Sequence, residues 1–264
     1  MQDKSATDAT FSPSRSWVDA VANRALAVVA SRSAGDRRQS DPELLAMMRQ
    51  CLLGGDRDAC KLTIRTMTDA GVPIDDIADL YIPDLAHQLG EDWCEDRLSF
   101  AEVTIGTSKL QTLLREISSD WAADKIGTPD LGAALVIVGA EENHTLGAQV
   151  LAARLRRRGM SVRVQLSATA GDVATTVERA DFDMVMISVS RRENLEMAQK
   201  FVEIVRNLAK RPPPIVVGGA LEVSTRDITD RTGADFATSD IDEALTLCGL
   251  DKRNRGDERR QSRG

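Results

Sequence analysis

The segment 131-LGAALVIVGAEENHTLGAQVLAARLRRRG-159 places a histidine between a predicted strand and a predicted helix. Residues 133–140 form a continuous apolar run of strand length, and residues 145–158 follow as a helix. His144, one of only two histidines in the 264-residue chain, lies in the turn between them. Ligands of open α/β sheets bind at the carboxyl ends of the strands, so this turn is a candidate binding site.

The same alternation continues through the C-terminal half of the chain. Further apolar runs of strand length are followed by helical segments, which is typical of a parallel sheet covered on both faces. The predicted strands are 133–140, 161–167, 183–190, 214–220 and 234–239, and the predicted helices are 145–158, 171–180, 194–210, 222–232 and 240–248. Residues 130–250 are therefore predicted to form a flavodoxin-like, doubly wound domain, followed by a charged tail over 251–264.

The N-terminal half is predicted to be helical. A polar start and a helix over 17–33 make up an N-terminal extension of residues 1–40. Four amphipathic segments then predict a four-helix bundle over 41–125, so the whole chain belongs to a combined α and α/β class. The bundle helices are predicted at 41–55 with Asp41 as N-cap, at 56–71, at 73–93 with a kink at Pro83, and at 99–124 with a Ser99–Glu102 capping box.

Composition excludes several functions. The net charge of -7 and the pI of about 5.1 argue against direct sequence-specific binding to DNA. There is no run of about 20 apolar residues, so we expect no membrane span, and the polar start does not look like a signal peptide. Four cysteines without zinc spacing favour a cytoplasmic protein. Two histidines cannot form a three-histidine metal centre, so any metal is expected to arrive inside a cofactor.

The turn 141-EENHTLG-147 contains neither a dinucleotide fingerprint nor a Walker A loop. Glu142 precedes His144 by two residues, and a carboxylate beside an imidazole is the arrangement that orients a metal-bound histidine. Gly147 allows a close approach to the backbone. The alternative interpretation of His144 is a surface histidine at the start of a helix.

Two further turns follow predicted strands at the same edge of the sheet. Ser188 and Ser190 offer hydroxyl groups and leave space for a ligand, or they are ordinary residues at a strand end. Gly218 and Gly219 permit a close approach of a ligand to the backbone, or they form a tight turn.

Taken together, the three turns resemble the cobalamin-binding domain family, whose pattern is Asp-x-His-x-x-Gly, then a serine element, then Gly-Gly. The matching elements are 142-ENHTLG-147, 188-SVS-190 and 218-GGA-220. The resemblance implies that His144 is the lower axial ligand of cobalt and replaces the dimethylbenzimidazole of the cofactor. It also implies that the displaced nucleotide tail passes Ser188 and is lined by the glycines. Glu142 stands where the family usually has Asp.

The segment 83-PDLAHQLGEDWCEDRLSFAE-102 resembles the signature of that family's helical cap. The resemblance implies that Trp93 and Glu102 contact the cofactor from its upper side. Val103 occupies the place of a histidine found in light-responsive members. The alternatives are that Trp93 is part of the bundle core and that Glu102 serves only the capping box.

Over residues 17–248 the chain resembles the AerR/PpaA family of photosynthesis antirepressors, which are related to cobalamin photoreceptors. The resemblance implies a non-enzymatic, light- or redox-responsive regulator that binds adenosyl-, methyl- or hydroxocobalamin, with haem as the alternative cofactor. Its implied partner is a DNA-binding repressor of photosystem genes of the PpsR/CrtJ type, and it leaves room for a homo-oligomer. The alternative function is a corrinoid methyl carrier of a methyltransferase system.

Overall fold

The computed structural model describes residues 11–31, 39–54, 57–123, 131–219 and 223–251. The chain divides into two compact units, Met1–Asp120 and Trp121–Gly264. Residues 1–10 of the predicted polar start and residues 252–264 of the charged tail lie outside the described residues.

The C-terminal unit contains a five-stranded, fully parallel sheet with the order β2-β1-β3-β4-β5. The strands are β1 Ala133–Gly139, β2 Ser161–Ala168, β3 Met184–Ser188, β4 Ile215–Gly218 and β5 Phe236–Ala237. This is the strand order of the flavodoxin-like fold, so the predicted doubly wound architecture is confirmed. β3, β4 and β5 are shorter than the predicted strands 183–190, 214–220 and 234–239.

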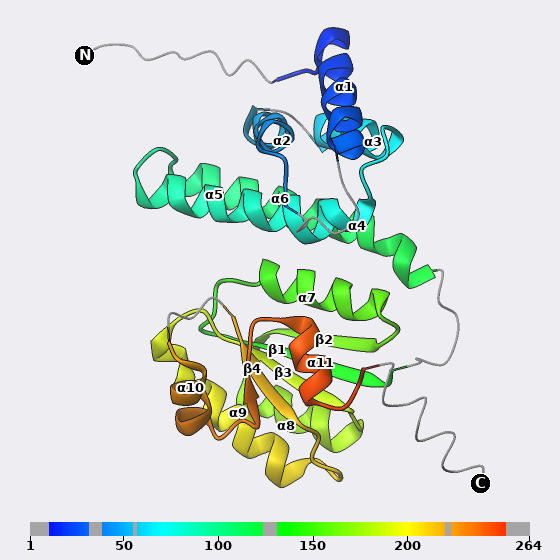
Figure 1. Ribbon diagram of the computed structural model, residues 1–264. Coiled ribbons are helices and arrows are strands. Elements are labelled where there is room, and N and C mark those ends of the chain that lie inside the picture. Colours follow the sequence, from blue (N-terminus) through cyan, green and yellow to red (C-terminus); the bar gives the residue numbers. More distant parts are fainter. Residues whose placement is uncertain (1–10, 32–38, 55–56, 124–130, 220–222, 252–264) are drawn as a thin grey trace, which may run out of the picture. The chain divides into compact units, whose positions relative to one another are not determined.

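Helices cover both faces of the sheet (Figure 1). Their bounds are α7 Leu146–Arg157, α8 Ala170–Arg179, α9 Leu195–Leu208, α10 Thr225–Thr232 and α11 Ile241–Leu247. α7 and α11 pack on one face through a core that includes Val136 and Leu155, and α8, α9 and α10 pack on the other around Ile187 and Phe201. The sheet is therefore buried on both faces, as its continuous apolar strands require.

The topology places a crevice at the carboxyl ends of β1 and β3. From β1 the chain crosses to β2 on one side, whereas β3 lies on the other side of β1. The helices that follow these two strands consequently lie on opposite faces of the sheet, and the loops diverge between them. The turns at 140–145 and 189–194 both begin at this point.

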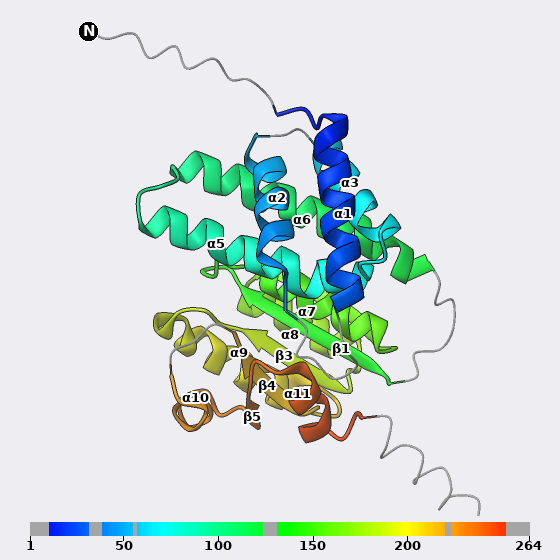
Figure 2. The same ribbon diagram turned by 45° about the horizontal axis from the view of Figure 1, so that its top comes forward.

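The N-terminal unit is helical, and its helices are best followed in Figure 2. They are α1 Arg15–Ser31, α2 Pro42–Gly54, α3 Arg57–Asp69, α4 Ile74–Asp76, η1 Ile77–Tyr81, α5 Ile82–Cys94 and α6 Phe100–Ala123. α1 packs against α2 and α3 and buries Val21 and Ala25 completely. The helical part of the predicted extension is thus a component of this unit.

The side chain of Asp41 forms hydrogen bonds to both α1 and α2. Its Oδ1 accepts hydrogen bonds from the backbone N–H groups of Glu43 and Leu44, as predicted for an N-cap. The same carboxylate accepts a 2.9 Å hydrogen bond from Arg24 Nε, which holds its pKa below the usual value. One side chain therefore caps α2 and fixes α1 beside it.

Pro83 disturbs its helix without breaking it. Residues 74–94 remain helical throughout, but Ile77–Tyr81 forms a π-helical turn immediately before the proline. Proline donates no backbone hydrogen bond and its ring needs space in the preceding turn. A wider π turn supplies that space, so the predicted kink takes the form of a local widening. Among the described residues, no helix is both long and apolar enough to span a bilayer.

Candidate functional site

The loop after β1 buries Glu142 and exposes His144. The backbone N–H of Glu142 donates to Gly139 O at 3.1 Å, which turns the chain back at the end of the strand. The side chain of Glu142 is only 2% exposed, whereas the imidazole of His144 is 71% exposed. Glu142 Oε1 lies 3.0 Å from His144 Nδ1 and also accepts the His144 backbone N–H at 3.1 Å. The glutamate side chain therefore spans the distance to the ring.

The contacts of His144 assign its tautomer. Ser190 Oγ donates to Glu142 Oε1 at 2.6 Å and lies 2.9 Å from His144 Nδ1. Since the single hydroxyl proton of Ser190 is used for the carboxylate, both oxygen atoms near Nδ1 can only accept. The ring proton is therefore on Nδ1, and the lone pair of Nε2 faces away from the cluster and is available to a metal.

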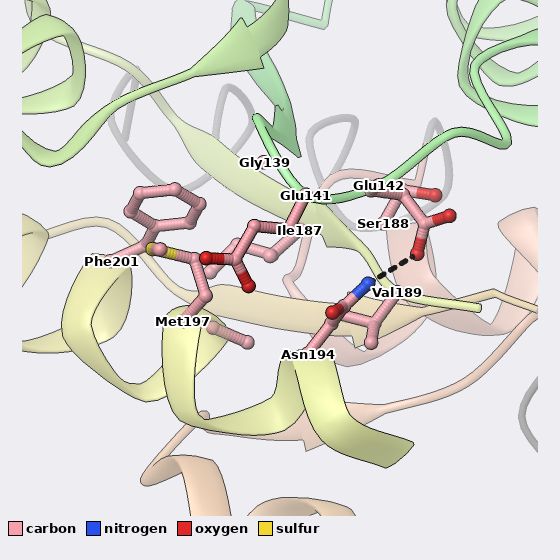
Figure 3. A pocket seen from close by; sticks show the side chains of 10 residues that line it. Gly139, Glu141, Glu142, Ile187, Ser188, Val189, Asn194, Met197 and Phe201 are labelled. Carbon is pink, nitrogen blue, oxygen red and sulfur yellow. Dashed lines mark hydrogen bonds between the residues drawn. The ribbon is translucent and has the colours of Figure 1, made fainter. Parts of the chain in front are cut away.

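The second carboxylate oxygen of Glu142 accepts hydrogen bonds from two residues between β3 and α9. Its Oε2 accepts the Ser190 backbone N–H at 2.8 Å and the Asn194 Nδ2 amide at 3.2 Å. Figure 3 shows Asn194, at the start of α9, turned toward this carboxylate. Asn194 was not among the predicted site residues, although it belongs to the 188–194 turn. Its position at the start of a predicted helix was the available signal.

Electrostatics keep Glu142 ionised. Burial alone raises the pKa of this carboxyl, but the hydrogen bonds from the hydroxyl and N–H of Ser190, followed by those from His144, outweigh it. The pKa of Glu142 falls to about 2. A permanently charged carboxylate that accepts from Nδ1 increases the basicity of the opposite ring nitrogen, as in carboxylate–histidine–metal arrangements.

The lowered pKa of Glu142 predicts a pH-dependent stability difference between the protein and its Glu142→Gln variant. The folded carboxyl has a pKa of about 2 against 4.5 for the ordinary value, so between these pH values the unfolded chain binds the extra proton. The stabilisation of the folded state by the ionised Glu142 carboxylate is complete above about pH 4.5 and is lost as the pH falls toward 2. We expect the two unfolding free energies to differ by roughly 3 kcal/mol at pH 6, to approach each other below about pH 4.5, and to converge only as the pH nears 2.

Urea unfolding of both proteins at several pH values between 6 and 2.5 measures this difference. A difference that stays constant over the whole range would mean that the carboxylate has an ordinary pKa.

A groove with a volume of about 440 Å³ begins at His144. It runs between α7 and the ends of β3, β4 and β5, and its lining is mostly apolar. The lining includes the predicted residues His144, Gly147, Ser188, Ser190, Gly218 and Gly219. A Cβ atom at Gly147 would extend into open space, so the absence of a side chain there widens the groove. An exposed imidazole that lines a largely apolar groove fits a metal cofactor that carries a long organic tail.

Gly218 and Gly219 are also required by the protein's own packing. A Cβ at Gly218 would lie 2.4 Å from Thr238 O, and one at Gly219 would lie 2.0 Å from Val189 O. Gly219 also has a φ of 138°, which side-chain-bearing residues rarely adopt. The tight-turn interpretation therefore holds for both glycines, and both line the groove as well.

Trp93 and Glu102 belong to the helical unit. Trp93 is 50% exposed and lies beside Phe100 with a ring-centroid distance of 6.5 Å, so the alternative that it is a bundle-core residue is wrong. Glu102 Oε2 accepts the Ser99 N–H at 2.7 Å, and Ser99 Oγ accepts the Glu102 N–H at 3.3 Å. The predicted capping box is confirmed, and a contact of either residue with a cofactor stays a prediction.

No three histidine, cysteine or acidic side chains gather to hold a metal ion in the part of the chain that the structure describes. The candidate axial histidine has a single nitrogen, Nε2, to offer to a metal.

Comparisons with known proteins support a cobalamin-binding domain in this chain. A family model described as the B12 binding domain matches residues 132–245. A Rhodobacter capsulatus protein described as an "Uncharacterized 20.5 kDa protein in bchF-crtJ intergenic region" is 37% identical over 181 residues, which are 69% of this chain and 94% of the relative. The Methanosarcina barkeri monomethylamine corrinoid protein has a similar structure, with a TM-score of 0.63 and 14% identity. That match covers 79% of this chain and 98% of the corrinoid protein.

Proposed function

Because this chain belongs to the same family as the Rhodobacter capsulatus protein encoded between bchF and crtJ, and carries a B12-binding domain, we propose that it is a cobalamin-dependent transcriptional regulator. In this proposal the chain acts as an antirepressor: it binds a DNA-binding repressor of the PpsR/CrtJ type and does not itself bind DNA or catalyse a reaction. The place of the relative's gene beside crtJ supports this choice of partner. The net charge of -7 supports action through a protein rather than through DNA.

The observation that carries the cofactor part of the proposal is the orientation of His144. Glu142 and Ser190 hold the proton on Nδ1, and Nε2 is left exposed at the mouth of the groove. His144 would bind cobalt through Nε2, and Ser188, Gly147 and the Gly218–Gly219 turn would line the nucleotide tail. The cobalamin would supply a bond to cobalt that light can break, or an upper ligand that can be exchanged.

A regulator of this kind needs a surface whose partner affinity depends on the cofactor. Cofactor binding can only shift that affinity if the cofactor interacts unequally with the two states of the protein. The loop 188–194 is suited to such a role, because Ser190 and Asn194 in it hydrogen-bond to Glu142 directly behind the axial histidine.

A corrinoid methyl carrier of a methyltransferase system is the second candidate. The structural likeness to a corrinoid protein shows a shared fold at 14% identity and is equally compatible with a carrier. The two functions differ in what the loaded protein recognises: a DNA-binding repressor in one case and a methyltransferase in the other. The comparisons name B12 and corrinoids and give no support to haem.

Absorption spectra and binding assays with one preparation test both the binding of cobalamin and the recognition of a repressor. The full chain is loaded with hydroxocobalamin or adenosylcobalamin, spectra are recorded in the dark and after illumination, and a purified PpsR/CrtJ-type repressor is added. We expect His144-dependent spectra of bound cobalamin and a repressor affinity that differs between loaded and cofactor-free protein. Equal repressor affinity in all states, together with methyl transfer from methylcobalamin in a methyltransferase assay, would establish the carrier instead.

A further inference from the structure

Asn194 immediately precedes α9 but does not cap this helix. Asparagine is a preferred N-cap residue, because its side-chain oxygen accepts a hydrogen bond from a free backbone N–H. Three other helices of the α/β unit begin in this way, with Thr169 before α8, Ser224 before α10 and Asp240 before α11. The side chain of Asn194 forms no capping bond, and its Nδ2 donates to Glu142 Oε2 at 3.2 Å. The amide is therefore used for the carboxylate rather than for the helix.

Asn194 connects Glu142 to a buried helix. Ser190, which contacts both carboxylate oxygens, lies in the loop between β3 and α9. Asn194 is buried, and the next residue, Leu195, belongs to the core on which α9 packs. A side chain held by an element of this kind is positioned more precisely than one held by a loop alone. Asn194 therefore gives the flexible Glu142 side chain a second, independent anchor.

The hydrogen bond between Asn194 and Glu142 lies beside a small cavity. Figure 3 shows both side chains, and the other walls of the cavity include Ile187, Met197 and Phe201. These three side chains have no hydrogen-bond donor. The volume of the cavity is about 10 Å³, which is room for about one water molecule. A carboxylate removed from water needs donors in place of its hydration, so loss of the Asn194 amide would leave Oε2 less firmly held.

We propose that Asn194 is a positioning residue for His144 and acts on it through Glu142. The Asn194 amide holds Oε2, so that Oε1 stays 3.0 Å from His144 Nδ1. This contact keeps the ring proton on Nδ1 and the lone pair of Nε2 available, because the partner of one ring nitrogen decides which nitrogen is protonated. The effect on the tautomer needs no cofactor, whereas the effect on cobalt binding rests on the proposed function.

The tautomer of His144 in the cofactor-free full chain is the first test. Nitrogen NMR of the imidazole distinguishes the Nδ1–H form from the Nε2–H form, and the chain has only one other histidine, His87. A His87→Ala background therefore leaves a single imidazole to observe. We expect the Nδ1–H form to predominate while Asn194 is present. In Asn194→Leu the ratio of Nδ1–H to Nε2–H is expected to fall roughly 3- to 10-fold, which is the effect of one ordinary hydrogen bond.

Absorption titration with hydroxocobalamin is the second test. The hydrogen-bond partners of a metal-binding histidine typically contribute about 10- to 100-fold to metal affinity. Asn194 acts through one intervening residue, so we expect Asn194→Leu to weaken binding by roughly 10-fold, at the lower end of that range. In a Glu142→Ala background the same substitution is expected to add no further loss, because there is then no carboxylate to position.

Two further variants accompany Asn194→Leu. Asn207→Leu makes the same change at an exposed position near the other end of α9, and it is expected to leave the tautomer and the affinity unchanged. Asn194→Ala avoids the larger side chain. It is expected to change both readouts in the same direction but less, because a water molecule can then donate to Oε2. Thermal unfolding of each variant verifies that the α/β unit is folded.

The outcomes separate this inference from the proposed function. If Asn194→Leu and Asn194→Ala leave the tautomer ratio of His144 unchanged, the positioning role is refuted, whatever the protein binds. If Asn194→Leu weakens cobalamin binding equally with and without the Glu142 carboxylate, Asn194 acts by another route and the proposal is wrong. If the unaltered protein binds no corrinoid but the tautomer ratio changes as expected, Asn194 positions His144 and only the cobalamin proposal fails.

Discussion

Replacement of His144 by alanine is expected to weaken cobalamin binding by roughly 100-fold or more. Changing a residue behind a metal ligand typically costs 10- to 100-fold in affinity, and removing the ligand itself should cost at least the upper end of that range. The expected loss is specific, because the imidazole is 71% exposed and contributes little to packing. Absorption titration with hydroxocobalamin gives the affinity, and the spectrum reports whether a histidine nitrogen is bound to cobalt.

His87→Ala is the matched control for this experiment. His87 is the other histidine of the chain, its side chain is 75% exposed on α5, and its Nδ1 lies 3.5 Å from Glu91 Oε1. We expect this variant to bind hydroxocobalamin as the unaltered protein does. Retention of affinity and spectrum by the His144 variant would refute the axial role and with it the cobalamin mechanism proposed above.

The Gly219→Ala variant is expected to lose roughly 3 kcal/mol or more of stability in the α/β unit. Holding a side-chain-bearing residue at such a φ costs about 1–3 kcal/mol by itself. The new Cβ would in addition lie 2.0 Å from Val189 O, where only movement of the backbone can relieve the overlap. Urea unfolding followed by circular dichroism measures the loss.

Gly147→Ala provides the contrast, because it also lines the groove but has open space at its Cβ position. Gly147 lies in the first turn of α7, where alanine favours the helix by up to about 1 kcal/mol. We expect equal or greater stability for this variant. If both alanine variants have the stability of the unaltered protein, the strain assigned to Gly219 does not exist.

Local sequence patterns were sufficient for the architecture of the α/β unit. The apolar run at 133–140 and the helix after it predicted β1 and α7 within one residue at most boundaries. Such runs are decisive because a strand buried on both faces cannot carry polar side chains, whatever the rest of the chain does. Alternation of these runs with helices then leaves few permitted topologies, since crossovers between parallel strands are right-handed.

Local sequence patterns predicted only part of the candidate site. Glu142 and His144 lie in one short turn, so their proximity followed from spacing. Ser190 was predicted as a hydroxyl near the ligand, but its simultaneous contacts with Glu142 and His144 depend on the register of β1 against β3. Asn194 was not predicted as a site residue. Its role depends on the place of α9 beside β3.

The amino-acid sequence determines the strands, the helices and the histidine turn, because each depends on residues only a few positions apart. Periodicity and local hydrogen bonding act at that range. The charge state of Glu142 and the tautomer of His144 are decided by tertiary structure. They depend on residues 46 to 52 positions apart along the chain, for example Ser190 and Asn194 around Glu142, and folding alone brings these into contact.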